Sequence, residues 1–359
     1  MTVSIGIVGL PNVGKSTLFN ALTNAEALAA NYPFATIEPN TGIVPVPDER
    51  LNVLQKMYSA EKIIPATVTF VDIAGLVAGA SKGEGLGNKF LANIRETDAI
   101  IHIVRAFENS EILRHDESAV NPKADIDIIN TELILADIET LEKRLPAIQK
   151  EAKAKPAARE TLGYLETLLR HLQGGTPLSA LPSLDTNAIR DLHLLTAKPV
   201  IYTFNVDEAT LADESKQQEL TNLVAPAHAI FVCAKLEEEL KGLDETDAKE
   251  LLDSYGVKET GLSQMIHAAY DTLGLQSYLT AGPKEVRAWT IKKGYTAPQA
   301  AGVIHTDFER GFIAAQIVDY DELVTAGSEQ AAKAAGKVRT EGKEYVMQPG
   351  DVVEFRFNV

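Results

Sequence analysis

The stretch that most constrains this chain is Gly9–Ser16, which reads Gly-Leu-Pro-Asn-Val-Gly-Lys-Ser. A glycine, four residues and then Gly-Lys-Ser is the spacing of a loop that wraps a chain of phosphates. The preceding Val3–Val8 is short, β-branched and mostly apolar, as in a buried parallel strand, and Lys15–Ala25 has the composition of a helix. This order predicts the first strand, loop and helix of an α/β domain that binds a nucleotide through its phosphates.

Further strand-like segments alternate with helical stretches along the first part of the chain. They are Ala66–Val71, Ala99–Val104, Val200–Phe204 and Ala229–Val232. Such alternation is typical of a doubly wound sheet. We therefore predict a P-loop α/β domain over residues 1–277, with a mixed sheet of the kind found in GTPases.

Residues 125–195 break this alternation. Apolar side chains three or four positions apart indicate two helices, separated by the charged connector Lys150–Pro156. The two stripes are Ile134, Ile138, Leu141, Leu145 and Ile148, then Leu162, Leu165, Leu169 and Leu172. We predict an inserted arm in which the helices pack antiparallel as a short coiled coil. The alternative is two surface helices on the α/β core.

The C-terminal residues 278–359 change character again and predict a separate, small α+β unit. Val286–Ile291, Gly311–Val318 and Val352–Phe357 have strand patterns, and Asp321–Ala335 has that of a helix ending at Gly336. These residues contain 10 Lys and Arg against 11 Asp and Glu, whereas the whole chain has a net charge of −16. A chain-wide cationic surface for nucleic acid, such as DNA binding needs, is excluded, and RNA contact is less penalised in this part.

The location of the protein is predicted from what the sequence lacks. Cys233 is the only cysteine, so no internal disulfide can form. The first residues have no basic signal-peptide region, and no apolar run approaches the roughly 20 residues of a membrane span. We expect a cytoplasmic protein without membrane contact.

The phosphate site is expected to consist of main-chain amides, one ammonium group and a helix N-terminus. Lys15 would place its charge on the terminal phosphates, and the Ser16 hydroxyl would ligate Mg²⁺. The residues predicted to hold the phosphates are Asn12, Val13, Gly14, Lys15, Ser16 and Thr17.

The second part of the phosphate site is expected at Asp72–Gly75, which reads Asp-Ile-Ala-Gly after a strand. Asp72 would support the Mg²⁺, and the Gly75 N–H would meet the γ-phosphate. Thr36 is our candidate for the hydroxyl that senses the metal, with Tyr32 and Thr41 as competitors. The glycine-rich stretch 79–87 is interpreted as a switch loop.

The nucleotide-binding part combines four stretches, Gly9–Ser16, Asn31–Asn40, Asp72–Val77 and Lys82–Asn88, and the C-terminal part adds Val286–Ile291 and His305–Phe312. The first four resemble the YchF group of Obg-like ATPases, and the last two are similar to that group's TGS domain. The resemblance extends over nearly the whole chain. The resemblance implies a ribosome-associated, Mg²⁺-dependent nucleoside triphosphatase with a C-terminal β-grasp domain. It also implies contact with the ribosome, in our prediction with the large subunit, and with ribosomal RNA through the TGS domain or the helical arm.

The base preference is predicted from Asn205–Glu208, which reads Asn-Val-Asp-Glu. Guanine-specific relatives have Asn-Lys-x-Asp here, and their aspartate pairs with two guanine donors that adenine lacks. Val206 and the longer Glu208 remove that geometry, so the family pattern implies ATP, with GTP as the alternative because Asp207 could substitute. The predicted base site is completed by a loop that resembles Ser-Ala-Lys, namely Cys233, Ala234 and Lys235. Cys233 could also be simply a small core residue.

The water-activating group is predicted to lie outside these motifs. Leu76 stands where classical relatives place a glutamine, so we expect slow intrinsic hydrolysis. Relatives are thought to use a histidine from a mobile loop, and His115 is the match, although Arg114 departs from the usual pattern. His102, within an apolar strand, is expected to be structural. In related GTPases an asparagine at the position of Asn12 helps to bind K⁺, which gives a further hypothesis.

Two other function classes remain to be weighed. A P-loop kinase would need an acceptor pocket and an arginine-bearing lid, neither of which is visible in the sequence. A ribosome- or RNA-binding module with a purely structural nucleotide is compatible with Leu76.

Overall fold

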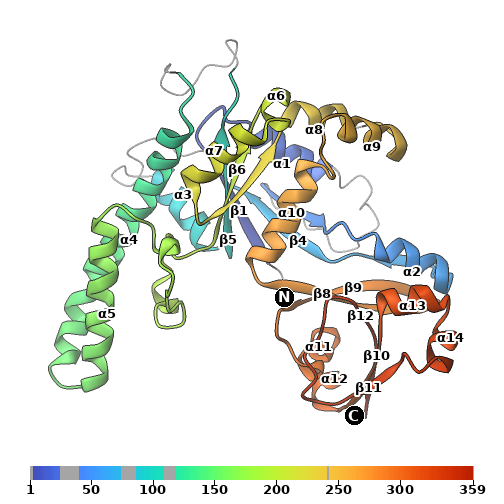
Figure 1. The fold of residues 1–359 in the computed structure, drawn as a ribbon. Helices are drawn as coiled ribbons and strands as arrows, with labels where there is room; N and C mark the ends of the chain where they lie inside the picture. Colours follow the sequence, from blue (N-terminus) through green and yellow to red (C-terminus); the bar gives the residue numbers. More distant parts are fainter. Residues whose placement is uncertain (1–2, 25–39, 74–85, 109–118, 241, 359) are drawn as a thin grey trace. The chain divides into compact units, whose positions relative to one another are not determined.

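The computed structural model describes residues 3–24, 40–73, 86–108, 119–240 and 242–358 (Figure 1). Their contacts group into two compact units. The large unit comprises Val3–Ile43 and Thr69–Ala269, and the small unit comprises Val44–Val68 and Tyr270–Val359. Within the described residues each unit is built on a six-stranded sheet.

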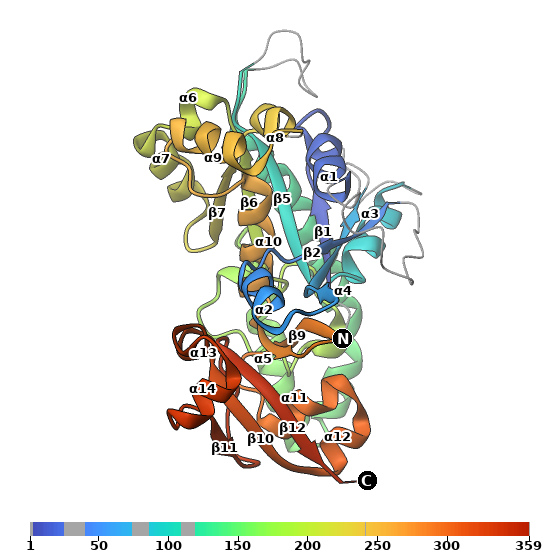
Figure 2. The same ribbon diagram turned by 90° about the vertical axis from the view of Figure 1, so that its right-hand side faces the viewer.

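The large unit contains the predicted doubly wound sheet, in the strand order β2-β4-β1-β5-β6-β7. Strand β1 pairs in parallel with β4 and β5, and β6 pairs in parallel with β5 and β7. Figure 2 shows β7, β6, β5 and β1 side by side in this order. The bounds are β1 Ser4–Val8, β2 Thr41–Pro45, β4 Thr67–Asp72, β5 Ala99–Arg105, β6 Val200–Asn205 and β7 His228–Val232.

The strands of this sheet read as nearly continuous apolar runs because helices cover both faces of such a sheet. All seven residues of β5 are buried. The helices outside the arm are α1 Lys15–Asn24, α3 Leu86–Arg95, α6 Glu208–Leu211, α7 Glu214–Val224, α8 Ala234–Leu240, α9 Glu245–Ser254 and α10 Gly261–Thr272. The expected strands and the first helix are confirmed to within two residues.

The helical arm consists of α4 (Pro122–Ala152) and α5 (Pro156–Gln173), which lie side by side as a hairpin (Figure 1). Asn121 caps α4 by accepting from the Ala124 N–H at 3.1 Å, and prolines begin both helices, where a missing N–H costs little. Every residue of the two predicted stripes packs into one apolar cluster together with Leu168. The pattern of apolar residues therefore identified the arm correctly.

The arm is joined to the α/β core by a buried carboxylate. Asp137 of α4 accepts from the N–H groups of Leu195 and Thr196, at 2.8 and 2.7 Å, and from the Thr196 hydroxyl at 2.6 Å. Burial raises the pKa of the Asp137 carboxyl. The two short 3₁₀ turns Leu178–Ala180 and Arg190–Leu192 lie between α5 and β6.

The small unit has the strand order β11-β10-β12-β8-β9-β3. Tyr278, Ile291 and Phe312 are in its apolar core, together with alanines of α11. Its elements are α2 Arg50–Tyr58, β3 Lys62–Ile64, β8 Leu275–Ala281, β9 Glu285–Lys292, α11 Ala297–Ile304, α12 Thr306–Arg310, β10 Phe312–Asp319, α13 Tyr320–Ala326, α14 Glu329–Ala334, β11 Arg339–Glu341 and β12 Asp351–Phe357. The predicted strands of this region are confirmed.

The small unit differs from expectation in two respects. The single helix expected over 321–335 is two helices, because Gly327 ends α13 in the left-handed region (φ 77°) and Ser328 caps α14. Residues 44–68 group with the C-terminal residues, because β3 pairs in parallel with β9. The domain limits 1–277, 125–195 and 278–359 stay a prediction, from which this grouping departs. In the described part of the chain no helix has the length and apolarity to cross a membrane.

Candidate functional site

The phosphate-binding loop connects β1 to α1, as its spacing predicts. Two of its residues have left-handed backbone, Asn12 with φ 63° and Gly14 with φ 92°. A Cβ on Gly14 would lie 2.4 Å from Nδ2 of Asn205, and a Cβ on Gly9 would lie 2.8 Å from the Ile103 carbonyl oxygen. Neither position has room for a Cβ, so both need glycine, and Gly14 also needs it because of its left-handed backbone.

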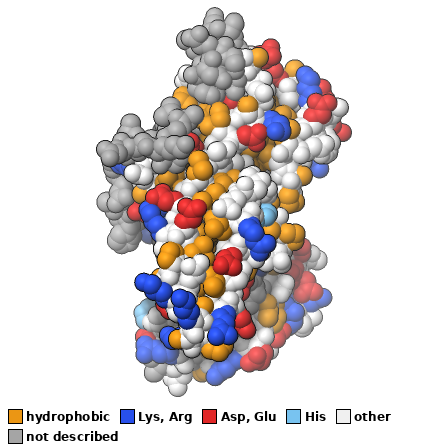
Figure 3. Space-filling view, turned by 90° about the vertical axis from the view of Figure 1, so that its left-hand side faces the viewer, with side chains coloured by type: hydrophobic (Ala, Val, Ile, Leu, Met, Phe, Trp, Pro, Cys, Tyr) orange, Lys and Arg blue, Asp and Glu red, His pale blue; other side chains and the backbone are white. Residues whose placement is uncertain are grey.

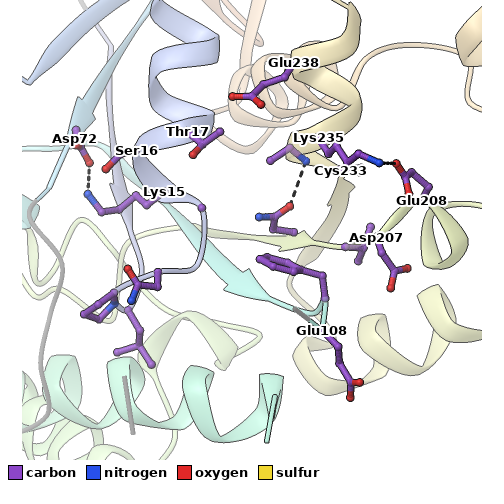
Figure 4. A pocket seen from close by; sticks show the side chains of 18 residues that line it. Lys15, Ser16, Thr17, Asp72, Glu108, Asp207, Glu208, Cys233, Lys235 and Glu238 are labelled. Atoms are coloured by element: carbon purple, nitrogen blue, oxygen red, sulfur yellow. Dashed lines mark hydrogen bonds and ion pairs between the residues drawn. The ribbon is translucent and has the colours of Figure 1, made fainter. Parts of the chain in front are cut away.

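Lys15 and Asp72 meet at one end of the site. The Lys15 ammonium donates to Oδ1 of Asp72, and the side chains are 10% and 18% exposed (Figure 4). Lys15 is the first residue of α1, and Asp72 is the last residue of β4, the strand that pairs with β1. The parallel sheet thus brings together two charges that are 57 positions apart in the sequence.

Asn205, the last residue of β6, links the two halves of the site. Its Nδ2 donates to the Val13 carbonyl at 3.0 Å, and its Oδ1 accepts from the Ala234 N–H at 3.2 Å. The side chain is 3% exposed. Both ends of this amide are therefore used to hold the phosphate loop against the loop after β7, whereas the sequence predicted a contact with the base.

The two carboxylates after β6 both have partners within the protein. Asp207 caps α6 by accepting from the Thr210 N–H at 2.8 Å, and the hydroxyl and N–H of Thr210 lower the pKa of the Asp207 carboxyl. Glu208 accepts from the Lys235 ammonium at 2.7 Å, and this ion pair raises the pKa of Lys235. Val206 is buried, and its N–H donates to the Val232 carbonyl at 2.9 Å, so its carbonyl is the group that could meet a base.

Two residues that follow β5 also line the site, although the sequence did not single them out. Nε of the buried Arg105 donates to the Phe107 carbonyl at 3.2 Å, and its guanidinium lies 4.6 Å from the centre of the Phe107 ring. Phe107 and the exposed Glu108 are thereby placed beside the residues after β6. The rule that ligands bind at the carboxyl ends of parallel strands could have found them.

These residues enclose a cavity of about 900 Å³. In Figure 4, Lys15 and Asp72 lie at one end, while Asp207, Glu208 and Lys235 lie at the other. Glu108 and Glu238 also line the cavity. Because four of its carboxylates lie away from Lys15, a polyanionic ligand is directed with its charge toward Lys15 and its neutral end toward Lys235.

Most predicted site residues are brought together in this cavity. Its lining includes Asn12, Gly14, Lys15, Ser16, Thr17, Asp72, Asn205, Val206, Glu208, Cys233, Ala234 and Lys235. Val13 takes part through the carbonyl that accepts from Asn205. Thr36, Gly75 and His115 lie outside the described residues, as do Leu76 and most of the glycine-rich stretch 79–87.

Burial bears on the expectations for Cys233 and His102. Cys233 is 4% exposed and packs in the apolar cluster around β6, as a small core residue does. It also lines the cavity, and its contact with the base stays a prediction. Its burial raises the pKa of the thiol. His102 is 1% exposed in β5, and burial lowers its pKa to about 3, as expected for a structural histidine.

The oxygen groups at the Lys15 end fit a magnesium ion. Mg²⁺ is bound in nucleotide sites by one or two protein oxygens together with phosphate oxygens. Asp72 already faces a cation, the Lys15 ammonium, and Ser16 points into the same end of the cavity (Figure 4). Over the described ranges no cluster of three or more His, Cys, Asp or Glu could hold a metal by itself.

Comparisons with known proteins match both units. A family model described as a 50S ribosome-binding GTPase matches residues 4–144. The C-terminal model of the YchF GTPases, described as a protein of unknown function (DUF933), matches residues 275–358.

Individual relatives match the whole chain. The ribosome-binding ATPase YchF of Haemophilus influenzae is 51% identical over 364 residues, and that of Bacillus subtilis is 50% identical over 367, each covering 100% of both chains. The solved structure of the Schizosaccharomyces pombe YchF GTPase is similar with a TM-score of 0.87 and 40% identity, over 99% of this chain and 98% of that one.

Proposed function

Because the chain belongs to the YchF family, we propose that it is a ribosome-binding P-loop ATPase that holds its nucleotide in the cavity between Lys15 and Lys235. The observation that carries this proposal is the pairing of both carboxylates after β6. Asp207 caps α6 and Glu208 holds Lys235. Each is therefore already bound by a donor of the protein, and pairing with the two guanine donors would compete with that contact, so the bias toward GTP is reduced.

Adenine has a hydrogen-bond donor that suits the Val206 carbonyl, namely its exocyclic amine. The N–H of Val206 already donates to the Val232 carbonyl of β7. The Phe107 ring, held by Arg105, supplies an apolar surface for the base. Glu108, exposed at the edge of the cavity, is placed to accept from a ribose hydroxyl.

We propose that the phosphates of the bound nucleotide replace Asp72 as the partner of Lys15. The Lys15 ammonium turns from Asp72 to the terminal phosphates, and Asp72 and Ser16 then hold Mg²⁺. When bound, the ion neutralises charge that develops on the phosphates during cleavage. The loop amides around Gly14 hold the phosphates in a fixed orientation, since Asn205 anchors the Val13 carbonyl.

The remaining roles rest on residues outside the described ranges. Gly75 is proposed to contact the γ-phosphate, Thr36 the metal, and His115 the attacking water. A His115→Ala variant should keep its affinity for ATP and lose most turnover. Unchanged turnover would remove His115 from the mechanism.

The large subunit is the proposed ribosomal partner, with a contact to ribosomal RNA, and a ribosome-bound protein would reside in the cytoplasm. K⁺ bound beside Asn12 is a further proposal. It predicts faster ATP turnover in K⁺ than in Na⁺, and equal rates would contradict it.

Two measurements test the proposed function. Competition of ATP and GTP against a fluorescent nucleotide should favour ATP, and equal or better binding of GTP would overturn the base assignment. ATP turnover should rise when ribosomes are added. Little change would favour the alternative in which nucleotide is only structural.

A further inference from the structure

The sheet of the small unit splits between two of its central strands. Strand β8 pairs with β9 as far as Ala281, and β12 pairs with β10 as far as Phe357. Between β8 and β12, in contrast, the register contains one pair in the described part of the chain, Val352 with Leu279. The last residues of β12 therefore run past β8 without a paired strand on that side.

The pairing of β12 with β10 shows which main-chain groups face this split. The Asn358 N–H donates to the Gly311 carbonyl at 2.9 Å, so it points toward β10. Because successive residues of a strand direct their main-chain groups to opposite sides, the N–H and C=O of Phe355 and Phe357 point away from β10. Within the described ranges no strand is paired with these two residues on that side. An open strand edge of this kind is a template for one more strand.

A cavity of about 550 Å³ lies at the split. Its lining comes from Val353 and Phe355 of β12, from Ile304 and Phe308 of the helices α11 and α12, and from the hairpin that joins β8 to β9. Figure 2 shows α12 beside β12. The Phe308 ring stacks on that of Phe357, with ring centroids 3.7 Å apart, and is thereby held next to the open edge. The volume is in the range of sites that bind ligands, about 300–1,000 Å³.

The lining of this cavity is mostly apolar and has little net charge. Its charged side chains are Lys284, Glu285 and Glu354. The face shown in Figure 3 is different, because Lys and Arg side chains gather toward its lower end. A polyanion such as RNA is attracted by a concentration of positive charge, which the cavity lacks. The cavity instead suits an apolar side chain of a segment with little net charge.

We propose that the split between β8 and β12 binds a short extended peptide segment of another protein. The segment adds a strand to the open edge of β12 and places one large apolar side chain in the cavity. The main-chain groups of Phe355 and Phe357 favour an extended backbone as the partner, and the cavity beside them selects the side chain. The site is separate from the nucleotide cavity, with which it shares no lining residue.

The test begins with a phage-displayed library of random short peptides, selected on the full chain. The proposal predicts that the selected peptides share one large apolar residue and carry little net charge. Synthetic copies are then titrated by fluorescence polarisation. Recovery of no peptide above the background of a surface without protein overturns the inference.

Methylation of single peptide N–H groups distinguishes strand addition from simple apolar binding. A strand directs alternate N–H groups toward the edge that it joins. N-methylation should therefore weaken binding about tenfold or more at alternate residues and leave it unchanged at the residues between them. Binding that tolerates methylation at every position would show that the cavity holds only a side chain, and would overturn the proposal.

Variants of the chain locate the bound peptide. Ile304→Ala and Phe308→Ala each remove part of the apolar lining and should weaken the selected peptides about tenfold or more. The controls Val324→Ala and Val346→Ala change side chains of the same unit that are 37% and 43% exposed and do not line the cavity. They should bind as the parent does, and thermal unfolding checks that all four variants are folded. Equal binding by all four would place the peptide elsewhere and overturn the proposal, as would a parent dimer that Phe308→Ala dissociates, because a second copy would then be the occupant.

Discussion

Removal of the Asn205 side chain should weaken the binding of phosphate groups even when no base is present. Asn205→Ala deletes two hydrogen bonds and leaves the Val13 carbonyl and the Ala234 N–H without their partner. A buried polar group left unpaired costs about 1–3 kcal/mol. Because solvent can enter from the cavity, we expect a loss of about 2–4 kcal/mol for the pair, or roughly 4–15 °C in the midpoint of thermal unfolding.

The assay uses two ligands, ATP and inorganic tripolyphosphate, which lacks a base. If Asn205 acts by holding the phosphate loop, isothermal titration should show that Asn205→Ala weakens both about tenfold or more, since about 1.4 kcal/mol corresponds to a factor of ten. Asn205→Asp keeps the acceptor for Ala234 but sets an oxygen against the Val13 carbonyl, so it should weaken both ligands as well. Asn222→Ala, on the exposed side of α7, is the control and should leave both affinities unchanged.

A loss of affinity for ATP alone would refute this account. If Asn205→Ala weakened the binding of ATP but left the binding of tripolyphosphate unchanged, Asn205 would contact the base, as the sequence alone suggested. Its role as a link between the two loops would then be wrong.

Three further predictions concern stability and conformation. Burial lowers the pKa of His102 to about 3, so as pH falls below 6.5 the imidazole is protonated only in the unfolded chain. The free energy of unfolding should therefore fall by about 2 kcal/mol from pH 7 to pH 5. Urea unfolding of His102→Leu should lack this loss, and an identical pH dependence of parent and variant would contradict the argument. Asp137→Ala leaves two main-chain N–H groups unpaired and should cost about 2–4 kcal/mol in the same assay, while a loss below about 1 kcal/mol would show that water replaces the carboxylate. Gly14→Ala should lose ATP affinity because its Cβ would meet the Asn205 side chain. Gly175 also has a left-handed backbone, with φ 80°, but open space around it, so Gly175→Ala should lose only about 1–2 kcal/mol of stability and bind ATP normally. Equal ATP binding by both variants would refute the steric argument.

The sequence predicted the site where local order determines it. The loop Gly9–Ser16 lies between a strand and a helix, and Asp72 follows a buried strand, so both had to lie at the carboxyl edge of one parallel sheet. The arm was equally predictable, because its apolar spacing of three and four leaves only one face for packing.

The sequence did not predict contacts made at long range. Strand β3 has only three residues, and its partner β9 is more than 200 positions away, so no local pattern indicates the pairing. The motif gave Asn205 as a polar site residue but not the atoms that it would bind. The break at Gly327 did have a signal, a glycine followed by a serine cap, which the apolar pattern of 321–335 obscured.

The central claim is that the Lys15 ammonium, paired with Asp72 in the structure, passes to the phosphates of ATP. Isothermal titration of parent and Lys15→Ala protein with ATP and Mg²⁺ tests it most directly. A hydrogen bond to a charged group contributes about 1.5–3 kcal/mol, so the account predicts that the variant binds ATP roughly 10- to 100-fold more weakly. Equal affinity of the two proteins would contradict it.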